Sequence, residues 1–585
     1  MSRWSALRCG RALLLGLALL AGIARPAAAL VELPASSGAA AGGGRERAMA
    51  AARPLELPGP RINAWGQPAP RHEFETLRAE GGSTPRHRLR IVERARGSDA
   101  HLFWPLPFRK GRAYQAELTL SAAAPVDVEV MLRRDEPPWD PYAIRTLRLG
   151  RTPQTVRLEG WALSDAPASL RVAVLGEGVD VFAGRPAVRE TPGGAFGPAL
   201  TQPVPDAFFG VHLMRLGQHL NWPDFDPGFV RLWDTRTTWK DLQPEPGGWN
   251  FGNAAWRRLD LYVNHVRRVG RAAQPLLVLG QTPRWASTEP DSHSPYGRGH
   301  AAPPRDTEDW RRYVRTLARR YAGRIRHWEL WNEPDHSIFY RGSVERMVEL
   351  ARVAREELKA ADPANVLVSP GLTMGQGLRW LHRFLAAGGG RHVDVIAFHW
   401  YYDSAPESLL PAIANVRQLM RQHGVADKPL WNTEGGLVCN KRLRDCSPMR
   451  LGEDEQLGLH ARAMLLMWSA GVARFDYYFW EGRWPGEALL EGDFRTPTLA
   501  GRGRAEAVRW MRGARVLDAF HVGERVWVLR MQRGERRFSI VWATEPTEVR
   551  LPREWGSTRL RRLDGRAARL EGGRVVVTEA PMLLQ

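Results

Sequence analysis

The chain has 585 residues and a formal net charge of +20, almost all of it carried by arginine. Because single hydrophobic cores rarely grow beyond about 250–300 residues, we expect more than one domain. The arginines are spread evenly, whereas a nucleic-acid-binding protein concentrates its positive charge on one element, so nucleic acid is not an expected partner. A basic surface could still favour an acidic polysaccharide or membrane headgroups.

The N-terminus has the pattern of a targeting segment. Arg3, Arg8 and Arg11 precede an apolar run at 12–24, and three alanines follow at 27–29. This order, with a run too short for a comfortable membrane span, predicts a secretory signal peptide at residues 1–29. An uncleaved anchor is the alternative. We therefore expect a periplasmic or secreted protein, a location that allows peripheral association with a membrane or with the export machinery.

Residues 30–60 are rich in Ala, Gly, Pro and Arg and predict a flexible linker. Residues 61–195 contain alternating strands with turn residues between them, which predict an all-β sandwich. This segment resembles the jelly-roll modules that often bind carbohydrate beside catalytic domains. The residues that could stack on sugars are Trp104, Trp139, Tyr142 and Trp161. Core or interface positions explain most of these four as well, so carbohydrate binding by this domain stays open.

Residues 196–512 alternate between apolar strands and helical stretches. The expected strands are 208–213, 229–235, 275–280, 327–335, 365–371, 393–402, 428–436 and 474–480. The helical stretches between them include 253–269, 307–321, 343–361, 408–423 and 453–470. Such βα units predict an α/β fold with a parallel sheet, and eight strands favour a closed (β/α)8 TIM barrel. A doubly wound open sheet is the alternative, but no Gly-rich phosphate loop follows any strand. Short strands return at 513–585 and predict a small structural β domain.

Two of these strands end in carboxylates. HWELWNEPD at 327–335 carries Asn332 and Glu333, and KPLWNTEGG at 428–436 carries Glu434. Taken alone, the first could be a strand end whose polar residues face solvent. In a parallel barrel, however, all strand ends converge on one face, so Glu333 and Glu434 could meet there. Glycoside hydrolysis needs two carboxylates that face each other across a sugar ring.

The motifs WNEPD, TPRWA and WNTEGG resemble those of the retaining clan A glycoside hydrolases on (β/α)8 barrels. They are most similar to the family 39 type, which contains β-xylosidases and α-L-iduronidases, and within it to bacterial hydrolases of biofilm exopolysaccharide. The resemblance covers roughly residues 205–512. It implies that Glu434 attacks the anomeric carbon while Glu333 acts as acid and then as base. Glu333 would start protonated and Glu434 ionised. Asn332 would bind the sugar 2-hydroxyl.

The same resemblance implies further substrate-binding residues. Arg231, on the second strand, would hold Glu434 ionised, although a core ion pair with Glu329 is the alternative. By strand parity, Glu329, Trp331 and Glu333 share one face, which would put Glu329 one layer below the site. The other implied or candidate contacts are His399 and Tyr401 of the sixth strand, Trp480 as a sugar platform, and Trp285 and Trp239 as cleft walls. A His on an apolar strand and tryptophans in general are also common core residues.

Cys439 and Cys446 follow the Glu434 strand, and in an oxidising compartment we expect them to form a disulfide. No cluster of ligands has metal-site spacing, so neither a metal nor another cofactor is expected. The sequence thus predicts a retaining hydrolase of O-glycosidic bonds in an extracellular or capsular polysaccharide or oligosaccharide. The alternatives are a non-catalytic polysaccharide-binding or scaffold protein on the same fold and a β-xylosidase-like exo-glycosidase.

Overall fold

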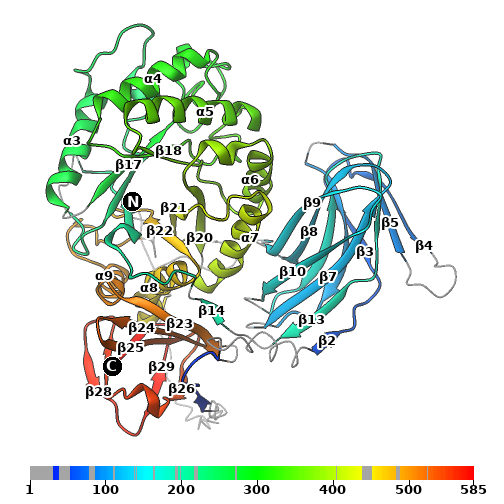
Figure 1. Cartoon of the computed structure of the whole chain (residues 1–585), viewed down its shortest axis with the longest axis vertical. Helices are drawn as coiled ribbons and strands as arrows, with labels where there is room; N and C mark the ends of the chain where they lie inside the picture. The colour runs from blue at the N-terminus through cyan, green and yellow to red at the C-terminus, as the bar shows by residue number, and fades with distance from the viewer. Residues whose placement is uncertain are drawn as a thin grey trace, which may run out of the picture.

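The computed structural model describes residues 30–38, 53–77, 86–95, 97–109, 112–136, 139, 141–162, 165–191, 195–197, 199–216, 222–270, 273–402, 405–437, 451–482, 488–522 and 525–585. They form an N-terminal pair of antiparallel sheets, a central parallel sheet covered by helices, and a C-terminal β domain (Figure 1). The predicted signal peptide lies outside these residues. Within the part of the chain that the structure describes, no helix is long and apolar enough to cross a membrane.

The N-terminal domain consists of two antiparallel sheets packed face to face. One has the order β2-β13-β7-β12-β5-β4 with β10 added beside β7, and the other has the order β3-β6-β11-β8-β9. Every second side chain of β7 is buried, as expected for a strand with one face on a core. The strands are β2 (Arg53–Leu55), β3 (Arg61–Trp65), β4 (Arg71–Leu77), β5 (Arg86–Glu93), β6 (Asp99–Leu106), β7 (Ala113–Ala122), β8 (Val126–Arg134), β9 (Pro141–Leu149), β10 (Gln154–Trp161), β11 (Ala168–Val174), β12 (Asp180–Ala183) and β13 (Ala187–Thr191).

The four aromatic residues considered for sugar stacking in this domain have different surroundings. Trp104 and Tyr142 are buried in the core between the two sheets. Trp161 packs against His521 and Trp527 of the C-terminal domain. Trp139 alone among the four has a large exposed face, with 47% of its surface accessible.

The central domain is built on eight parallel strands in the order β19-β18-β17-β16-β15-β22-β21-β20. The sheet curls, and an isolated parallel bridge between Val368 and Val395 joins its two edges. The strands are β15 (Phe209–His212), β16 (Phe229–Leu232), β17 (Gln274–Leu279), β18 (His327–Leu330), β19 (Val366–Val368), β20 (Ile396–Tyr402), β21 (Leu430–Leu437) and β22 (Val472–Tyr477). Each lies at its predicted place, and the mixed α/β class is confirmed.

Helices cover the outer side of this sheet, and side-chain caps fix several of their starts. Asn253, Asp306 and Ser343 accept hydrogen bonds from the backbone at the N-termini of α3, α4 and α5. The helices are α2 (Trp239–Leu242), α3 (Ala254–Val269), α4 (Thr307–Arg320), α5 (Val344–Ala361), α6 (Gln376–Ala386), α7 (Leu409–Gln422), α8 (Glu453–Ser469) and α9 (Leu499–Met511). Because the strands are parallel, their carboxyl ends all lie at the same end of the sheet.

The C-terminal domain has a seven-stranded sheet of order β14-β23-β24-β25-β30-β27-β28 and a small sheet of order β1-β26-β29. Its strands are β1 (Val31–Glu32), β14 (Ala195–Gly197), β23 (Arg515–Val522), β24 (Val526–Arg533), β25 (Arg536–Ala543), β26 (Thr547–Arg550), β27 (Arg559–Arg562), β28 (Ala567–Arg569), β29 (Arg574–Val577) and β30 (Met582–Leu584). β1 and β14, which precede the central domain in sequence, therefore complete the sheets of the C-terminal domain.

The prediction of a linker at 30–60 is wrong at both ends of that segment. Val31 pairs with Val549, Leu33 is buried in the C-terminal core, and Ser37 bonds both carboxylate oxygens of Asp518 at 2.7 and 2.8 Å. At the other end, β2 pairs with β13. The apolar pair in Val31-Glu32-Leu33 lies on one face of a strand, a signal that the average composition of the segment conceals.

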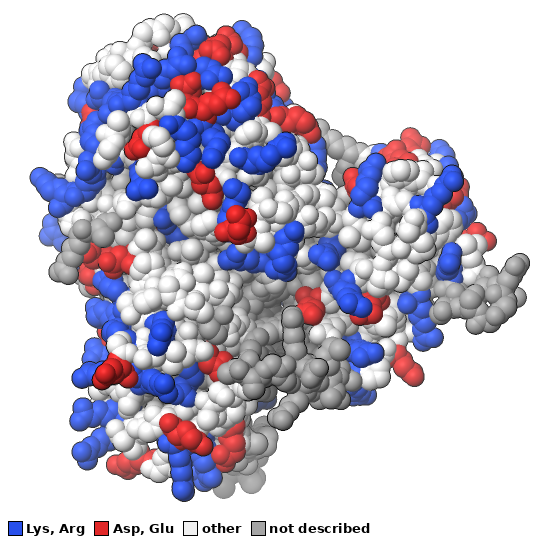
Figure 2. Space-filling view, viewed as in Figure 1, with Lys and Arg blue, Asp and Glu red and all other residues white. Residues whose placement is uncertain are grey.

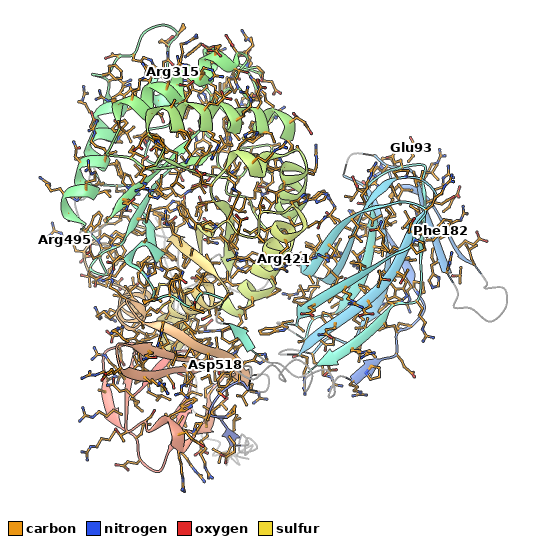
Figure 3. The ribbon with its side chains drawn as sticks, viewed as in Figure 1. Glu93, Phe182, Arg315, Arg421, Arg495 and Asp518 are labelled. Atoms are coloured by element: carbon orange, nitrogen blue, oxygen red, sulfur yellow. The ribbon has the colours of Figure 1, made fainter. Side chains whose placement is uncertain are left out.

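Specific contacts join the domains. The backbone N–H of Ile144 donates to Asn415 of α7 at 2.7 Å, and Arg379 of α6 pairs with buried Glu129 at 2.9 Å. Arg421, at the end of α7, lies on the side of this helix that faces the N-terminal sheets (Figure 3). At the C-terminal interface, buried Glu407 accepts hydrogen bonds from Arg462 and from the indole of Trp542, both at 2.9 Å.

Candidate active site

Glu333 lies where the chain leaves β18, on a backbone held in an uncommon conformation. Trp331 and Glu333 have φ values of 58° and 43°, which residues with a side chain rarely adopt. The backbone N–H of Glu333 donates to the carbonyl of Gly371 at 2.9 Å, and the Trp331 indole donates to the carbonyl of Phe339 at 2.8 Å. Strained non-glycine residues persist only where the surroundings fix them, and they cluster at functional sites.

The positive φ at Trp331 also changes which residues share a face. Glu329 is fully buried on the inner side of the sheet, as parity predicts for a layer below the site. Trp331, however, packs against Trp310 of α4 and Tyr340, so its ring lies on the helix side. The prediction that Glu329, Trp331 and Glu333 share one face is wrong at Trp331, because β18 ends at Leu330 and the regular alternation ends with it.

Glu434 lies at an irregularity in β21. The register between β20 and β21 shifts between Phe398 and His399, so that His399 pairs with Glu434 and Thr433 is skipped. Thr433 and Glu434 both reach side chains of the inner layer, since Thr433 donates to Glu329 at 2.9 Å and Glu434 contacts Arg231. Bulges re-aim side chains in this way beside active sites.

Arg231, on β16, connects the two carboxylate layers. Its Nε and Nη2 donate to both oxygens of Glu329 at 2.6 and 3.0 Å, its Nη1 donates to Glu434 Oε2 at 2.8 Å, and its Nη2 also donates to Asn332 Oδ1 at 2.8 Å. Burial opposes its charge, but Glu329 and Glu434 together raise the pKa of Arg231. Arg231 therefore contacts both Glu434 and Glu329, the two partners considered from the sequence. Removing the guanidinium would leave the buried Glu329 carboxylate unpaired, which costs about 3–5 kcal/mol.

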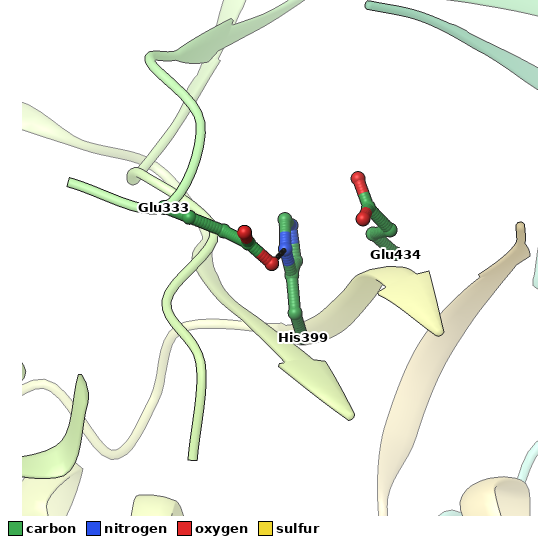
Figure 4. Close-up of side chains that lie close together, drawn as sticks. All are labelled: Glu333, His399 and Glu434. Carbon is green, nitrogen blue, oxygen red and sulfur yellow. Dashed lines mark hydrogen bonds and ion pairs between the residues drawn. The ribbon is translucent and has the colours of Figure 1, made fainter. Parts of the chain in front are cut away.

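His399 lies between the two candidate catalytic carboxylates (Figure 4). Its Nδ1 is 2.8 Å from Glu333 Oε1, and its Nε2 is 3.2 Å from Thr433 Oγ1. Because the Thr433 hydroxyl donates to Glu329, it accepts from His399, which assigns a proton to Nε2. Burial opposes a second proton, but Glu434, Glu329 and Glu333 raise the pKa of His399 to about 9.

The electrostatics differ from the expected order of the two carboxyls. Burial raises the pKa of Glu333, but the hydrogen bond and the charge of His399 outweigh burial and lower it. Burial raises the pKa of Glu434, and Glu333 adds to this, against His399, Arg231 and Tyr401. In the substrate-free protein the pKa of Glu333 is thus lowered and that of Glu434 raised, the reverse of the order expected for an acid and a nucleophile.

The carboxylates are also close to each other. Single ligand atoms of Glu333, His399 and Glu434 all lie within 4.8 Å of one another. A metal ion at this position would have to replace the bond between Glu333 and His399 and would face the Arg231 guanidinium bonded to Glu434. Tyr401, on β20, donates to Glu434 Oε1 at 2.7 Å, so both oxygens of Glu434 have donors.

The predicted aromatic platform is not at the site. Trp480 is only 3% exposed and packs against Phe225 in the core, because the chain after β22 turns it away from the strand ends. Trp239 is fully buried. Trp285 is half-buried, stacks edge-on against Trp239, and donates to the carbonyl of Gln243 at 3.0 Å. Cys439 and Cys446 lie outside the described residues.

Three residues that sequence reasoning missed border the site. Asp234, just after β16, accepts hydrogen bonds from the hydroxyls of Tyr296 at 3.1 Å and Tyr478 at 3.0 Å. Burial raises the pKa of Asp234, and its charge interacts with Arg231 and Glu333. The ring of Tyr478 is 6.2 Å from that of Tyr401. Asp234 and Tyr478 follow the observed ends of β16 and β22, but both fall inside the longer strands expected from the sequence, so the strand-end signal missed them.

Comparisons with known proteins agree with this geometry. The family model for Glycosyl hydrolases family 39 matches residues 255–434, a range that contains both glutamates. The chain is a glycoside hydrolase that resembles family 39. The structure of a family 39 glycoside hydrolase from Bacteroides cellulosilyticus WH2 is 16% identical, with a TM-score of 0.50, and the match covers 78% of this chain and 94% of that one.

Other solved structures are similar at a lower level. A monomeric β-xylosidase from Caulobacter crescentus CB15 is 14% identical with a TM-score of 0.48, and the match covers 67% of this chain and 97% of that one. A glucosidase from Croceicoccus marinus is 14% identical with a TM-score of 0.47 and the same coverage. A search of curated proteins finds no match. The substrate of this glycoside hydrolase is a carbohydrate.

Proposed function

We propose that this glycoside hydrolase retains anomeric configuration, with Glu434 as nucleophile and Glu333 as acid and then base. The observation that carries the proposal is the approach of their carboxylate oxygens to within 4.8 Å. Retaining enzymes hold their carboxyl groups about 5–5.5 Å apart, whereas inverting enzymes need about 6.5–9.5 Å to admit a water. The bridge between Val368 and Val395 supports a closed (β/α)8 barrel as the scaffold, and the paired N-terminal sheets support a jelly-roll.

In the first step, Glu434 attacks the anomeric carbon. Arg231 and Tyr401 each bind one of its oxygens, which orients the carboxylate and stabilises its charge before attack. Glu333 protonates the leaving oxygen, and His399 supplies the proton across their 2.8 Å contact. In the second step Glu333 takes a proton from a water molecule and returns it towards His399. The water oxygen bonds to the anomeric carbon, and the bond from that carbon to Glu434 breaks.

Substrate positioning falls to residues around the two glutamates. Asn332, held by Arg231 at 2.8 Å, binds the sugar 2-hydroxyl, and Asp234 binds a hydroxyl further round the ring. Tyr478 replaces Trp480 as the aromatic wall, since it is partly exposed and lies beside Tyr401. We further propose an extracellular or capsular polysaccharide as substrate, a periplasmic or secreted location, and a disulfide between Cys439 and Cys446. The targeting pattern at residues 1–29 supports the location.

Replacing Glu434 by Ala tests the assignment. Turnover should fall to background, because no nucleophile remains, and azide should restore part of it as a glycosyl azide of inverted configuration. Glu345→Ala is the control, since this exposed glutamate on α5 takes no part in the candidate site and its ion pair with Arg383 is long, at 4.0 Å. Full loss without azide rescue, in a folded Glu434→Ala protein, would remove Glu434 from its role.

A further inference from the structure

A groove of about 630 Å³ lies on the outer side of α3 and α4. Its walls include Trp249, Phe251, Asp260, Arg319, Arg320 and Arg324. None of the residues of the candidate active site lines it. The groove contains three guanidinium groups and one carboxylate on its walls, so its local charge is positive. Over the outer helices in the upper part of Figure 2, Lys and Arg are intermixed with Asp and Glu.

One guanidinium of the groove is held rigidly. Arg320 pairs with Asp260 at 2.8 Å, and its guanidinium carbon lies 4.7 Å from the ring centre of Phe251 and 5.2 Å from that of Trp256. Asp260 also accepts from the Tyr321 hydroxyl at 2.9 Å. Stacking of this kind pre-organises an arginine, so little entropy is lost when it binds a ligand.

The other two guanidiniums have no carboxylate partner among the described residues. Arg324 donates to the carbonyl of Arg320 at 2.7 Å and lies 4.8 Å from the ring centre of Tyr321. Arg319 is exposed on the last turn of α4. Together they offer N–H donors in the fork geometry that binds a carboxylate through two parallel hydrogen bonds.

An aromatic surface completes the groove. Phe251 is 42% exposed, one of the largest open apolar faces on the described part of the molecule, and Trp249 beside it is half-buried. An open aromatic ring suits the apolar C–H face of a pyranose. The aromatic ring would contact the sugar face and the neighbouring guanidinium groups would bind its carboxylate, so the groove matches a sugar that carries a carboxylate.

We propose that this groove is a second carbohydrate-binding site, which takes a uronate-bearing segment of an acidic polysaccharide away from the site of cleavage. The inference rests on the proposed function in one respect only, namely that the enzyme acts on a polysaccharide. The exposed ring of Phe251 beside the guanidinium groups favours a carboxylate carried on a sugar over a bare phosphate. Binding here would tether the enzyme to its polymer and raise the local concentration of cleavable bonds.

Binding to the full-length protein tests the inference without reference to turnover. The probes are a hexamer of α-1,4-linked galacturonic acid and the same hexamer with its carboxyl groups reduced to alcohols. Titration calorimetry at 50 mM salt should give at least tenfold tighter binding of the acidic hexamer. The double variant Arg319→Glu/Arg324→Glu should lose tenfold or more of that affinity. Arg536→Glu/Arg537→Glu, two exposed positions on β25 with the same change in net charge, should stay within twofold.

A third variant separates a sugar site from a simple patch of charge. Phe251→Ala should weaken the acidic hexamer about fivefold and leave tripolyphosphate unchanged, with an unaltered melting temperature as the check on folding. Equal losses in the two double variants, or an unaffected Phe251→Ala protein, would overturn the proposal. So would binding of single-stranded DNA or anionic vesicles at the groove without binding of the hexamer. Hydrolysis of aryl glycosides is assayed separately, so its absence would count against the proposed function alone.

Discussion

Glu333 and Glu434 differ in what holds them. Glu333 is bonded to His399 at 2.8 Å, whereas Glu434 is bonded to Arg231 and Tyr401 at 2.8 and 2.7 Å. An arginine stays charged at every working pH, while the proton on a histidine can move. The residue proposed to donate and recover a proton is thus the one in contact with a titrating partner.

Replacing Glu333 by Ala removes the proposed acid and leaves the proposed nucleophile, Glu434, in place. Glycosides with poor leaving groups should lose about 10²–10⁴-fold in kcat/KM, because their departure requires protonation. Aryl glycosides with good leaving groups should lose far less in the first step. A series of aryl glycosides of graded leaving-group acidity measures the effect as a steeper dependence in the variant. A uniform loss across the series would contradict the role of Glu333 as acid.

His399 sets the alkaline limit of activity in this account. Its pKa of about 9 means that the proton shared with Glu333 is lost as the pH rises through that value, so kcat/KM should fall there. His399→Gln keeps a hydrogen bond but carries no titrating proton. The alkaline limb, meaning the fall of kcat/KM at high pH, should therefore occur about one pH unit or more lower in this variant. Tyr401→Phe is the matched control, since it should lower kcat and leave the limb in place.

The same residue links pH to stability. The pKa of His399 is higher in the folded protein than the ordinary value of 6.5, so the folded state binds the proton more tightly. Its contribution to stability is complete below about pH 6.5 and is lost as the pH rises through about 9. The melting temperature of the wild type should therefore fall more over this interval than that of His399→Gln. An alkaline limb and a melting profile that are both unchanged in His399→Gln would contradict the shared proton.

At the scale of single elements, two departures from regular structure make the site. The chain turns through positive φ after β18, and β21 carries a register shift at Thr433. The strand ends and both glutamates could be predicted from apolar runs that alternate with helical stretches and end in polar residues. The orientation of Trp331 and the burial of Trp480 could not, because parity holds only while the strand stays regular. Asp234 escaped because the expected second strand continued past it to residue 235, while β16 ends at Leu232.

Gly371 illustrates how closely these elements fit. A Cβ added there would lie 2.0 Å from His399 Nε2, so Gly371→Ala must displace the imidazole. We expect kcat/KM to fall at least tenfold and the free energy of unfolding to drop by about 1–3 kcal/mol, as overpacking does. Gly150→Ala is the control, since a Cβ there meets no atom within 4 Å. Chemical denaturation and kinetics on the same samples check both values. Unchanged kinetics in Gly371→Ala would mean that the position of His399 is not critical.

At the scale of the whole molecule, segments distant in sequence complete one another's sheets. β1 and β14 both join the C-terminal domain, although they flank the N-terminal domain in sequence. Composition placed residues 30–60 in a linker because six large apolar residues, scattered through a segment of Ala, Gly and Pro, give no periodic signal. Long-range pairing of that kind depends on the partner strand, which a local pattern does not contain.

The curled parallel sheet brings Glu333, after β18, close to Glu434, on β21, and their proximity supports the proposed retention of configuration. Proton NMR of the anomeric signals in the first minutes of hydrolysis measures the outcome directly. With carboxylate oxygens within 4.8 Å of each other, no water fits between Glu434 and the anomeric carbon, and the first product should keep the configuration of the substrate. Initial release of the opposite anomer would contradict direct attack by Glu434.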